Sequence, residues 1–173
     1  MLLSAADVMK GLEMLTDELS RRTIGTRIQI VGGAAIALQV SRAALTRDVD
    51  VLQIGDTSIV QASEAVAAKL GWPNDWLNGA ANMFASHYDD EGDWTDLIQR
   101  DGIKIQIAKP ELLLAMKLSA GRGARDLSDV ELLLEACRVN QVSEATHIFE
   151  RYFPTEVMPE RSMKYLLHRL AGE

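Results

Sequence analysis

The stretch GGAAIALQVSRAALTRDVDVL, residues 32–52, decides how this chain is interpreted. It opens with a glycine pair and a run of small residues, and it ends with two aspartates separated by one valine. Residues 27–31 (RIQIV) before it are predicted to form a strand, and residues 34–40 a short buried helix packed closely through its alanines. Residues 41–46 are predicted to form a loop, and residues 47–54 alternate as a second strand does.

Asp48 and Asp50 differ by two positions, so on a strand both point to one face while Val49 and Val51 point into the core. Two carboxylates about 6–7 Å apart along a strand repel each other unless they are solvated, paired with basic groups or bound to one divalent cation. Carboxylates, water and substrate phosphates are the usual ligands of Mg²⁺. The pair therefore indicates either an edge strand with a polar face or a magnesium site.

The residues before the pair favour the metal interpretation. Backbone N–H groups at a turn such as Gly32-Gly33, where a helix begins, can hold a phosphate. Arg42 and Arg47 flank the same loop and could add cationic contacts. The stretch therefore predicts a site for the phosphates of a nucleotide.

The remaining pattern predicts a mixed α/β (α+β) fold in one compact unit, with an α/β front over residues 1–108 and a helical back over residues 109–173. Asp101-Gly102 indicates a hairpin. The other predicted features are a helix over 5–21 capped by Ser4, a second strand closed by Gly55-Asp56, a helix from Thr57 or Ser58 to Gly71, a loop and short helix over 72–84, hairpin strands 94–100 and 103–108, a helix from Pro110 to Ala120, a helix capped by Asp126, a helix capped by Ser143 and a last helix over 160–171.

Composition restricts the class of protein. The formal net charge of −7 argues against binding nucleic acid or an anionic membrane by bulk electrostatics alone. No apolar run reaches the length of a membrane span and no signal-peptide pattern is present, so a cytoplasmic location is expected. The single cysteine, Cys137, is expected to be a buried thiol, and the three scattered histidines do not have the spacing of a zinc site.

The strand, the glycine pair opening a helix, and the D-x-D sequence on the next strand resemble the polymerase-beta-type nucleotidyltransferase superfamily. Residues 73–81 (PNDWLNGAA) and 110–134 (PELLLAMKLSAGRGARDLSDVELLL) are similar to small bacterial nucleotidyltransferase-like proteins related to the AbiEii-type toxins. The resemblance covers residues 28–134.

This resemblance implies a small mixed-sheet nucleotidyltransferase core with a helical C-terminal part. It implies that Mg²⁺ bridges the triphosphate of an NTP, and that an acceptor hydroxyl on a tRNA 3′ end or a protein side chain takes the NMP. A toxin of this kind would have a cognate antitoxin as its partner. Carried over to this chain, Asp48 and Asp50 would be catalytic metal ligands, Gly32 and Gly33 would shape the phosphate turn, and Lys117 would contact phosphates.

Asp129 would match the downstream aspartate of the toxin-like motif. Alternatively, it is a first-turn partner of the helix dipole, and Lys117 is a solvated charge. Arg122 and Arg125 either hold phosphate or cover a helix end. Trp72 and Trp76 either stack on a base or, as we expect, pack the loop against the core.

One departure from the superfamily pattern bears on activity. Active members usually carry a third carboxylate on a neighbouring strand, whereas residues 103–108 (IKIQIA) contain none. Lys104 and Gln106 are expected to share one face there, and Asp96 or the acidic segment 89–93 are the possible substitutes. A catalytically degenerate binding or regulatory protein is therefore the alternative to an enzyme, and a nucleotidyltransferase for a small molecule such as an aminoglycoside is the third hypothesis.

Overall fold

The computed structural model describes residues 1–41, 43–52, 57–122 and 126–172. It divides into two compact units, which we call unit 1 (Met1–Met83 and Trp94–Ala108) and unit 2 (Phe84–Asp93 and Lys109–Glu173). The expectation that residues 1–108 and 109–173 pack as one compact unit stays a prediction. The predicted Gly55-Asp56 turn and two of the predicted phosphate contacts, Arg42 and Arg125, lie outside the described residues.

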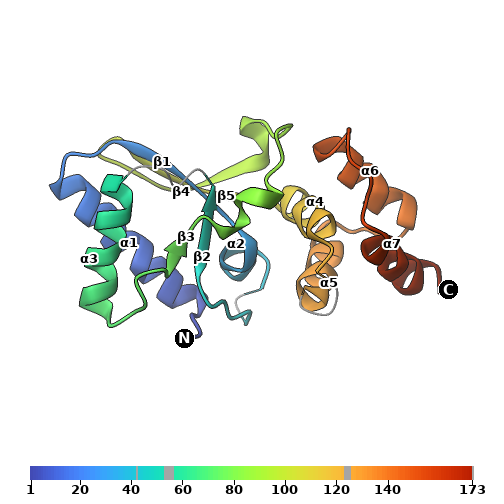
Figure 1. Cartoon of the computed structure of the whole chain (residues 1–173), viewed down its shortest axis with the longest axis horizontal. Coiled ribbons are helices and arrows are strands. Elements are labelled where there is room, and N and C mark those ends of the chain that lie inside the picture. The colour runs from blue at the N-terminus through green and yellow to red at the C-terminus, as the bar shows by residue number, and fades with distance from the viewer. Residues whose placement is uncertain (42, 53–56, 123–125, 173) are drawn as a thin grey trace. The chain divides into compact units, whose positions relative to one another are not determined.

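Unit 1 contains a five-stranded mixed sheet, which confirms the predicted fold class (Figure 1). The strand order is β3-β2-β1-β5-β4; β1 pairs antiparallel with β2 and parallel with β5, β2 pairs parallel with β3, and β4 pairs antiparallel with β5. The elements are α1 (Ala5–Arg21), β1 (Thr26–Val31), α2 (Gly32–Gln39), β2 (Val49–Leu52), α3 (Thr57–Leu70), β3 (Leu77–Asn78), a 3₁₀ turn (Ala80–Phe84), β4 (Trp94–Arg100) and β5 (Ile103–Ala108).

The first helix follows directly from its sequence. Ser4 caps α1 as predicted, and Asp7 completes a capping box by accepting hydrogen bonds from the Ser4 backbone and hydroxyl. Val8, Leu12 and Leu15 recur at helical spacing and are fully buried. Helix α1 therefore lies with its apolar stripe in the core of unit 1, and it contacts α2, α3 and β5.

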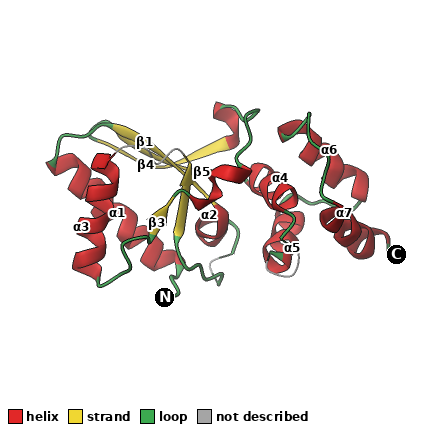
Figure 2. Cartoon of the chain, in the orientation of Figure 1, coloured by secondary structure: helices red, strands yellow, loops and turns green. Residues whose placement is uncertain are grey.

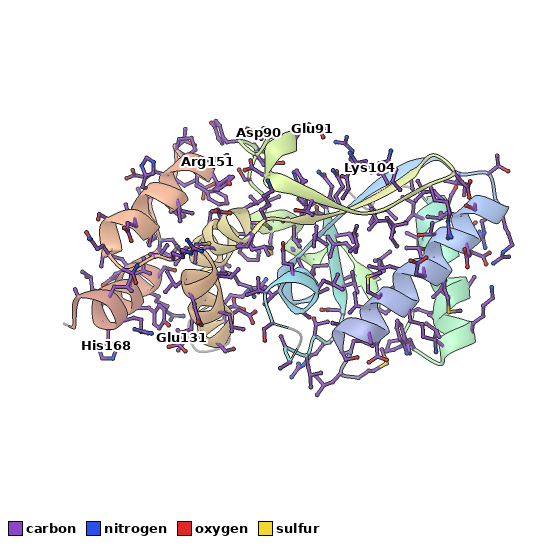
Figure 3. The ribbon with its side chains drawn as sticks, turned by 180° about the vertical axis from the view of Figure 1, so that it is seen from behind. Asp90, Glu91, Lys104, Glu131, Arg151 and His168 are labelled. Atoms are coloured by element: carbon purple, nitrogen blue, oxygen red, sulfur yellow. The ribbon has the colours of Figure 1, made fainter. Side chains whose placement is uncertain are left out.

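The two faces of the sheet differ in character. One face carries buried apolar side chains such as Ile30 and Ile105, and helices α1, α2 and α3 lie on this side (Figure 1). The other face carries polar residues in register, with Gln29 opposite Gln106 and Gln106 opposite Asp96. Figure 3 shows Lys104 on the side of the sheet away from α1. The alternation of apolar and polar side chains, which was predicted for single strands, therefore gives β1, β5 and β4 a common apolar face and a common polar face.

Several predicted boundaries were wrong. Strand β2 begins at Val49, so Asp48 lies just before it, and α2 begins at Gly32, so both glycines are in its first turn. Strand β3 was not predicted, because two residues show no periodicity. In unit 2, helix α6 (Val142–Tyr152) has Gln141 at its N-cap, so Ser143 is inside the helix and does not cap it.

Unit 2 contains helices and loops, as Figure 2 shows. The segment 84–93 belongs to it through Asp93, a buried carboxylate whose Oδ1 accepts hydrogen bonds from Arg151 (2.9 Å) and the Tyr152 hydroxyl (2.7 Å). Desolvation and the bond to Asp93 raise the pKa of Tyr152. The elements are a 3₁₀ turn (Glu91–Asp93), α4 (Pro110–Ala120), α5 (Leu127–Ala136), α6 (Val142–Tyr152), α7 (Glu160–Leu166) and a π-helical turn (Leu167–Ala171).

Cys137 is half-buried, whereas the sequence predicted a buried thiol. Desolvation nevertheless raises the pKa of this thiol to about 12, as expected of an unreactive cysteine. Within the described residues, no helix has both the length and the apolar character needed to span a bilayer.

Glu18 on α1 makes the stability of unit 1 depend on pH. Its carboxylate is almost fully buried, which by itself would raise its pKa, but hydrogen bonds from Lys69 on α3 and from Arg22 and Arg21 lower the pKa to about 2. Because the pKa is lower in the folded than in the unfolded chain, the charged carboxylate stabilises the fold above about pH 4.5, and this contribution is lost as pH falls toward 2.

We therefore expect Glu18→Gln to lower the midpoint of urea unfolding at pH 7, with the difference from wild type shrinking between pH 4.5 and pH 2.5. Glu64→Gln, at an exposed position on α3, is the matched control and should leave the midpoint unchanged at each pH. A difference between Glu18→Gln and wild type that stays constant over this range would contradict the prediction.

Candidate functional site

The two aspartates lie at the start of strand β2. Asp48 immediately precedes the strand and Asp50 is its second residue; both are half-buried, while Val49 and Val51 are buried in the core as predicted. Asp50 is in register with Val31 at the end of β1 and with Asn78 on β3. The sheet therefore presents Asp50 beside the point where β1 turns into α2.

The glycine pair allows this close approach. Gly32 has a φ of +66°, and a methyl group on its Cα would lie 2.7 Å from the Oδ2 of Asp50. A methyl group on Gly33 would lie 2.8 Å from the Oγ1 of Thr46. A side chain at Gly33 would therefore press on the Thr46 hydroxyl, and one at Gly32 would press on the Asp50 carboxylate and would also strain the backbone at its positive φ.

Thr46 holds that segment in place. It is buried, and its hydroxyl donates a hydrogen bond of 2.9 Å to the backbone carbonyl of Asp48. Its backbone forms an isolated antiparallel β-bridge with Leu3 near the N-terminus. The Thr46 N–H donates to the Leu3 carbonyl at 3.0 Å, and the Leu3 N–H donates to the Thr46 carbonyl at 2.7 Å. The backbone before Asp48 is thus fixed from both sides.

Strand β3 fixes the other side of the pair. The backbone N–H of Val49 donates to the carbonyl of Trp76 at 2.6 Å, and the Trp76 indole is buried and donates to the carbonyl of Ser63. The rings of Trp72 and Trp76 meet edge to face with their centres 5.3 Å apart, and both rings lie against Gly11 of α1. The tryptophans therefore pack the loop against the core, as expected, rather than forming an exposed surface on which a base could stack.

The start of α2 lies beside the aspartates. Val31, at its N-cap position, has no side-chain oxygen that could cap the helix. The N–H groups of the first turn are the kind that binds a phosphate. Arg47, the other predicted phosphate contact of this loop, is exposed between Thr46 and Asp48.

A third carboxylate is not adjacent to this pair in the part of the chain that the structure describes. Gln106 is buried on β5, and its amide donates to Asp96 on β4 at 2.7 Å; this bond and the ion pair with Lys104 hold the pKa of Asp96 below its usual value. Strands β1 and β5 separate β2 from β4, so Asp96 is about 14 Å across the sheet from Asp50. That span is too long for two ligands of one Mg²⁺.

Three of the predicted residues of unit 2 lie together. The Lys117 ammonium lies 2.8 Å from Asp126 Oδ1 and 2.7 Å from Asp129 Oδ2, and the exposed fractions of the three side chains are 15%, 8% and 26%. Asp126 occupies the N-cap of α5, but its side chain makes no capping bond, because it pairs with Lys117. Lys117 is therefore not a solvated charge. Arg122 lies over the ring of Phe84, 4.5 Å from its centre.

Residues 7–166 match the model of a family described as "Nucleotidyltransferase of unknown function (DUF6036)". The chain belongs to this family. Among curated proteins and among solved structures, none is similar enough to count as a match. The matched range includes the glycine pair, both aspartates and the Lys117 cluster, so the nucleotidyltransferase resemblance read from the sequence is supported over most of the chain.

Two residues of this nucleotidyltransferase-family chain were not anticipated at the site: Thr46 and Asn78. Asn78 donates to Asp48 Oδ2 at 3.2 Å. Thr46 stands in a loop, and Asn78 stands in an Asn-Gly dipeptide that indicates a turn. For Asn78, the sequence feature that could have indicated a fixed position was the pair Trp72 and Trp76 just before it, because large aromatic residues in a loop commonly anchor that loop to the core.

Proposed function

We propose that this family member is a Mg²⁺-dependent nucleotidyltransferase that moves an NMP from an NTP to a hydroxyl of a tRNA or a protein. The observation that carries the proposal is the position of Asp50, whose carboxylate lies against Gly32 at the start of α2 with Asp48 two residues before it. A carboxylate pair beside a helix N-terminus offers ligands for a divalent cation and donors for the phosphates that accompany it.

The donor set fits Mg²⁺. This cation is commonly bound by one or two carboxylates together with substrate phosphates and water. Asp48 and Asp50 would supply the carboxylates, and the first-turn N–H groups of α2 would orient the triphosphate. When bound, Mg²⁺ would neutralise charge that develops on the phosphates during transfer. Because the substrate completes the ligand set, we expect Mg²⁺ and NTP to bind more tightly together than either alone.

The proposed reaction breaks a phosphoanhydride bond of the NTP and forms a phosphate ester bond to the acceptor. The acceptor oxygen forms a bond to the α-phosphorus, and the bond from that phosphorus to the oxygen bridging to the β-phosphate breaks. Pyrophosphate leaves with the bonding electron pair, and the acceptor proton passes to solvent water. The side chains near Gly32 position the reactants, which is the main contribution of a protein to phosphoryl transfer.

The acceptor and the biological role rest on the resemblance to AbiEii-type toxins. The similar segment 110–134 supports a toxin of a toxin–antitoxin pair, with a tRNA 3′ end or a protein side chain as acceptor. A gene for a cognate antitoxin beside this one would add to that support.

The test is transfer of label from each α-³²P-NTP, with Mg²⁺, to total tRNA or to proteins of a lysate. We expect label on one class of acceptor with one NTP, and loss of the label in EDTA. Nuclease and protease digestion of the product would identify the acceptor class. Absence of transfer with all four NTPs and both acceptors would contradict the proposal.

The second candidate is a catalytically degenerate protein that binds nucleotide or a partner. The distance of Asp96 from Asp50 favours it, because this one of the two possible substitutes for the third carboxylate is three strands away. Thermal unfolding separates the two candidates. An NTP that raises the melting temperature only with Mg²⁺ supports the enzyme, whereas an NTP that raises it equally in EDTA supports the degenerate protein.

A further inference from the structure

The Asn78 side chain makes three hydrogen bonds at the edge of the sheet. Its Nδ2 donates to Asp48 Oδ2 and to the backbone carbonyl of Asp75, each at 3.2 Å, and its Oδ1 accepts from the backbone N–H of Ala80 at 2.9 Å. A half-buried amide with both ends engaged has one orientation. Asn78 therefore links the turn of residues 75–80 to a carboxylate of the candidate site.

The orientation of this amide determines what it can do. The N–H of Ala80 can only donate, so the atom of Asn78 that faces it is the oxygen. The NH₂ group then faces Asp48, and an NH₂ group cannot be a metal ligand. Asn78 is thus a donor to one carboxylate oxygen and restricts rotation of the Asp48 carboxylate.

The backbone that carries Asn78 is anchored on the core. Asn78 is the register partner of Asp50 in the pairing of β2 with β3. The residue two positions before it, Trp76, is buried with its indole hydrogen-bonded, and its carbonyl accepts from Val49, the residue between the two aspartates. Asn78 is therefore held in a fixed position relative to both carboxylates.

We propose that Asn78 is a positioning residue that orients Asp48 for a divalent cation. This inference rests on the proposed function, since it requires that Asp48 and Asp50 bind a cation. Residues that hydrogen-bond to metal ligands fix the direction of the ligand lone pairs, and their loss commonly weakens metal binding by about 10–100-fold. Asn78 acts through Asp48 and does not contact the cation.

The experiment measures Mn²⁺ binding to the full chain by electron paramagnetic resonance of free Mn²⁺, which requires no NTP or acceptor. We expect Asn78→Ala to raise the Kd for Mn²⁺ by about 10–100-fold. Asp75→Asn is the matched control: its side chain is exposed in the same turn and only its backbone carbonyl contacts Asn78, so its Kd should stay within about twofold of wild type. Melting in EDTA reports whether each variant is folded.

Asn78→Asp is the second variant, in case Asn78→Ala does not fold. It keeps the acceptor for the Ala80 N–H but turns the donor toward Asp48 into a carboxylate. We expect its Kd for Mn²⁺ to fall by about tenfold, because a second carboxylate beside Asp48 adds negative charge where the wild type has a neutral donor. A folded variant of either kind with a wild-type Kd would overturn the role of Asn78.

The variants Asp48→Asn and Asp50→Asn distinguish the two possible failures. If they lose Mn²⁺ binding while both Asn78 variants bind normally, the inference about Asn78 is wrong and the proposed site stands. If they bind Mn²⁺ as wild type does, the proposed site is wrong and the inference fails with it.

Discussion

Replacing Asp48 or Asp50 by Asn is expected to slow Mg²⁺-dependent nucleotidyl transfer by about a thousandfold. Asn has the shape of Asp but lacks its charge, so it is a poor ligand for a hard cation. A bound cation provides several kcal/mol of transition-state stabilisation in phosphoryl transfer, and each 1.4 kcal/mol is about a factor of ten in rate. The label-transfer assay described above measures the effect.

Asp48→Asn should not weaken the fold. An Asn oxygen can still accept the hydrogen bond from Asn78, and Asp48 is half-buried two residues before Asp50, so removing its charge lowers repulsion between like charges in the metal-free protein. We expect a melting temperature in EDTA equal to or above that of wild type. Asp75→Asn, at the exposed turn next to β3, is the control for activity and should retain the wild-type rate. Wild-type transfer by Asp48→Asn would show that the site is wrongly assigned.

Replacing Lys117 by Met is expected to destabilise the protein by about 3–5 kcal/mol. The ammonium lies between two carboxylates in unit 2, and one of them, Asp126, has a side chain only 8% exposed. Met fills a similar volume without a charge, so it would leave Asp126 and Asp129 close together and without their cation. Uncompensated charge in a buried position is among the most costly changes that a single substitution can cause.

Urea unfolding followed by circular dichroism measures this effect. Lys164→Met is the matched control, because the pair formed by Lys164 and Glu160 on α7 is exposed and should contribute less than about 0.5 kcal/mol. A loss below about 1 kcal/mol for Lys117→Met would mean that the cluster is hydrated well enough to tolerate bare carboxylates. The inference that Lys117 stabilises unit 2 by neutralising Asp126 and Asp129 would then be wrong.

Local signals in the sequence were sufficient for the elements whose formation is local. The Ser4 cap, the Asp101-Gly102 hairpin and Pro110 at the start of α4 each determine backbone geometry within a few residues, and the structure confirms all three. The alternation of Val49 and Val51 likewise predicted which side of β2 is buried.

What could not be predicted depends on contacts between distant segments. Strand β3 exists because Trp76 is anchored in the core and its carbonyl meets the N–H of Val49, 27 positions earlier in the chain. Asp126 has the sequence position of a helix cap, but its carboxylate pairs with Lys117 on α4 and makes no capping bond. A neighbouring charge from another element can thus overrule a local capping preference.

The division of the chain bears on the order in which it can fold during synthesis. Segment 84–93 is made before β4 and β5, yet it belongs to unit 2 and its buried Asp93 is paired with Arg151 and Tyr152. The sheet can be completed once residue 108 has left the ribosome, whereas Asp93 waits for Arg151 and Tyr152. Those partners follow residue 108 by about 45 residues, which at typical synthesis rates is about 2–9 seconds. Over that interval we expect a folded sheet that carries an unfolded internal loop, and a nascent chain arrested once residue 120 is outside the ribosome should be cut by protease between β3 and β4.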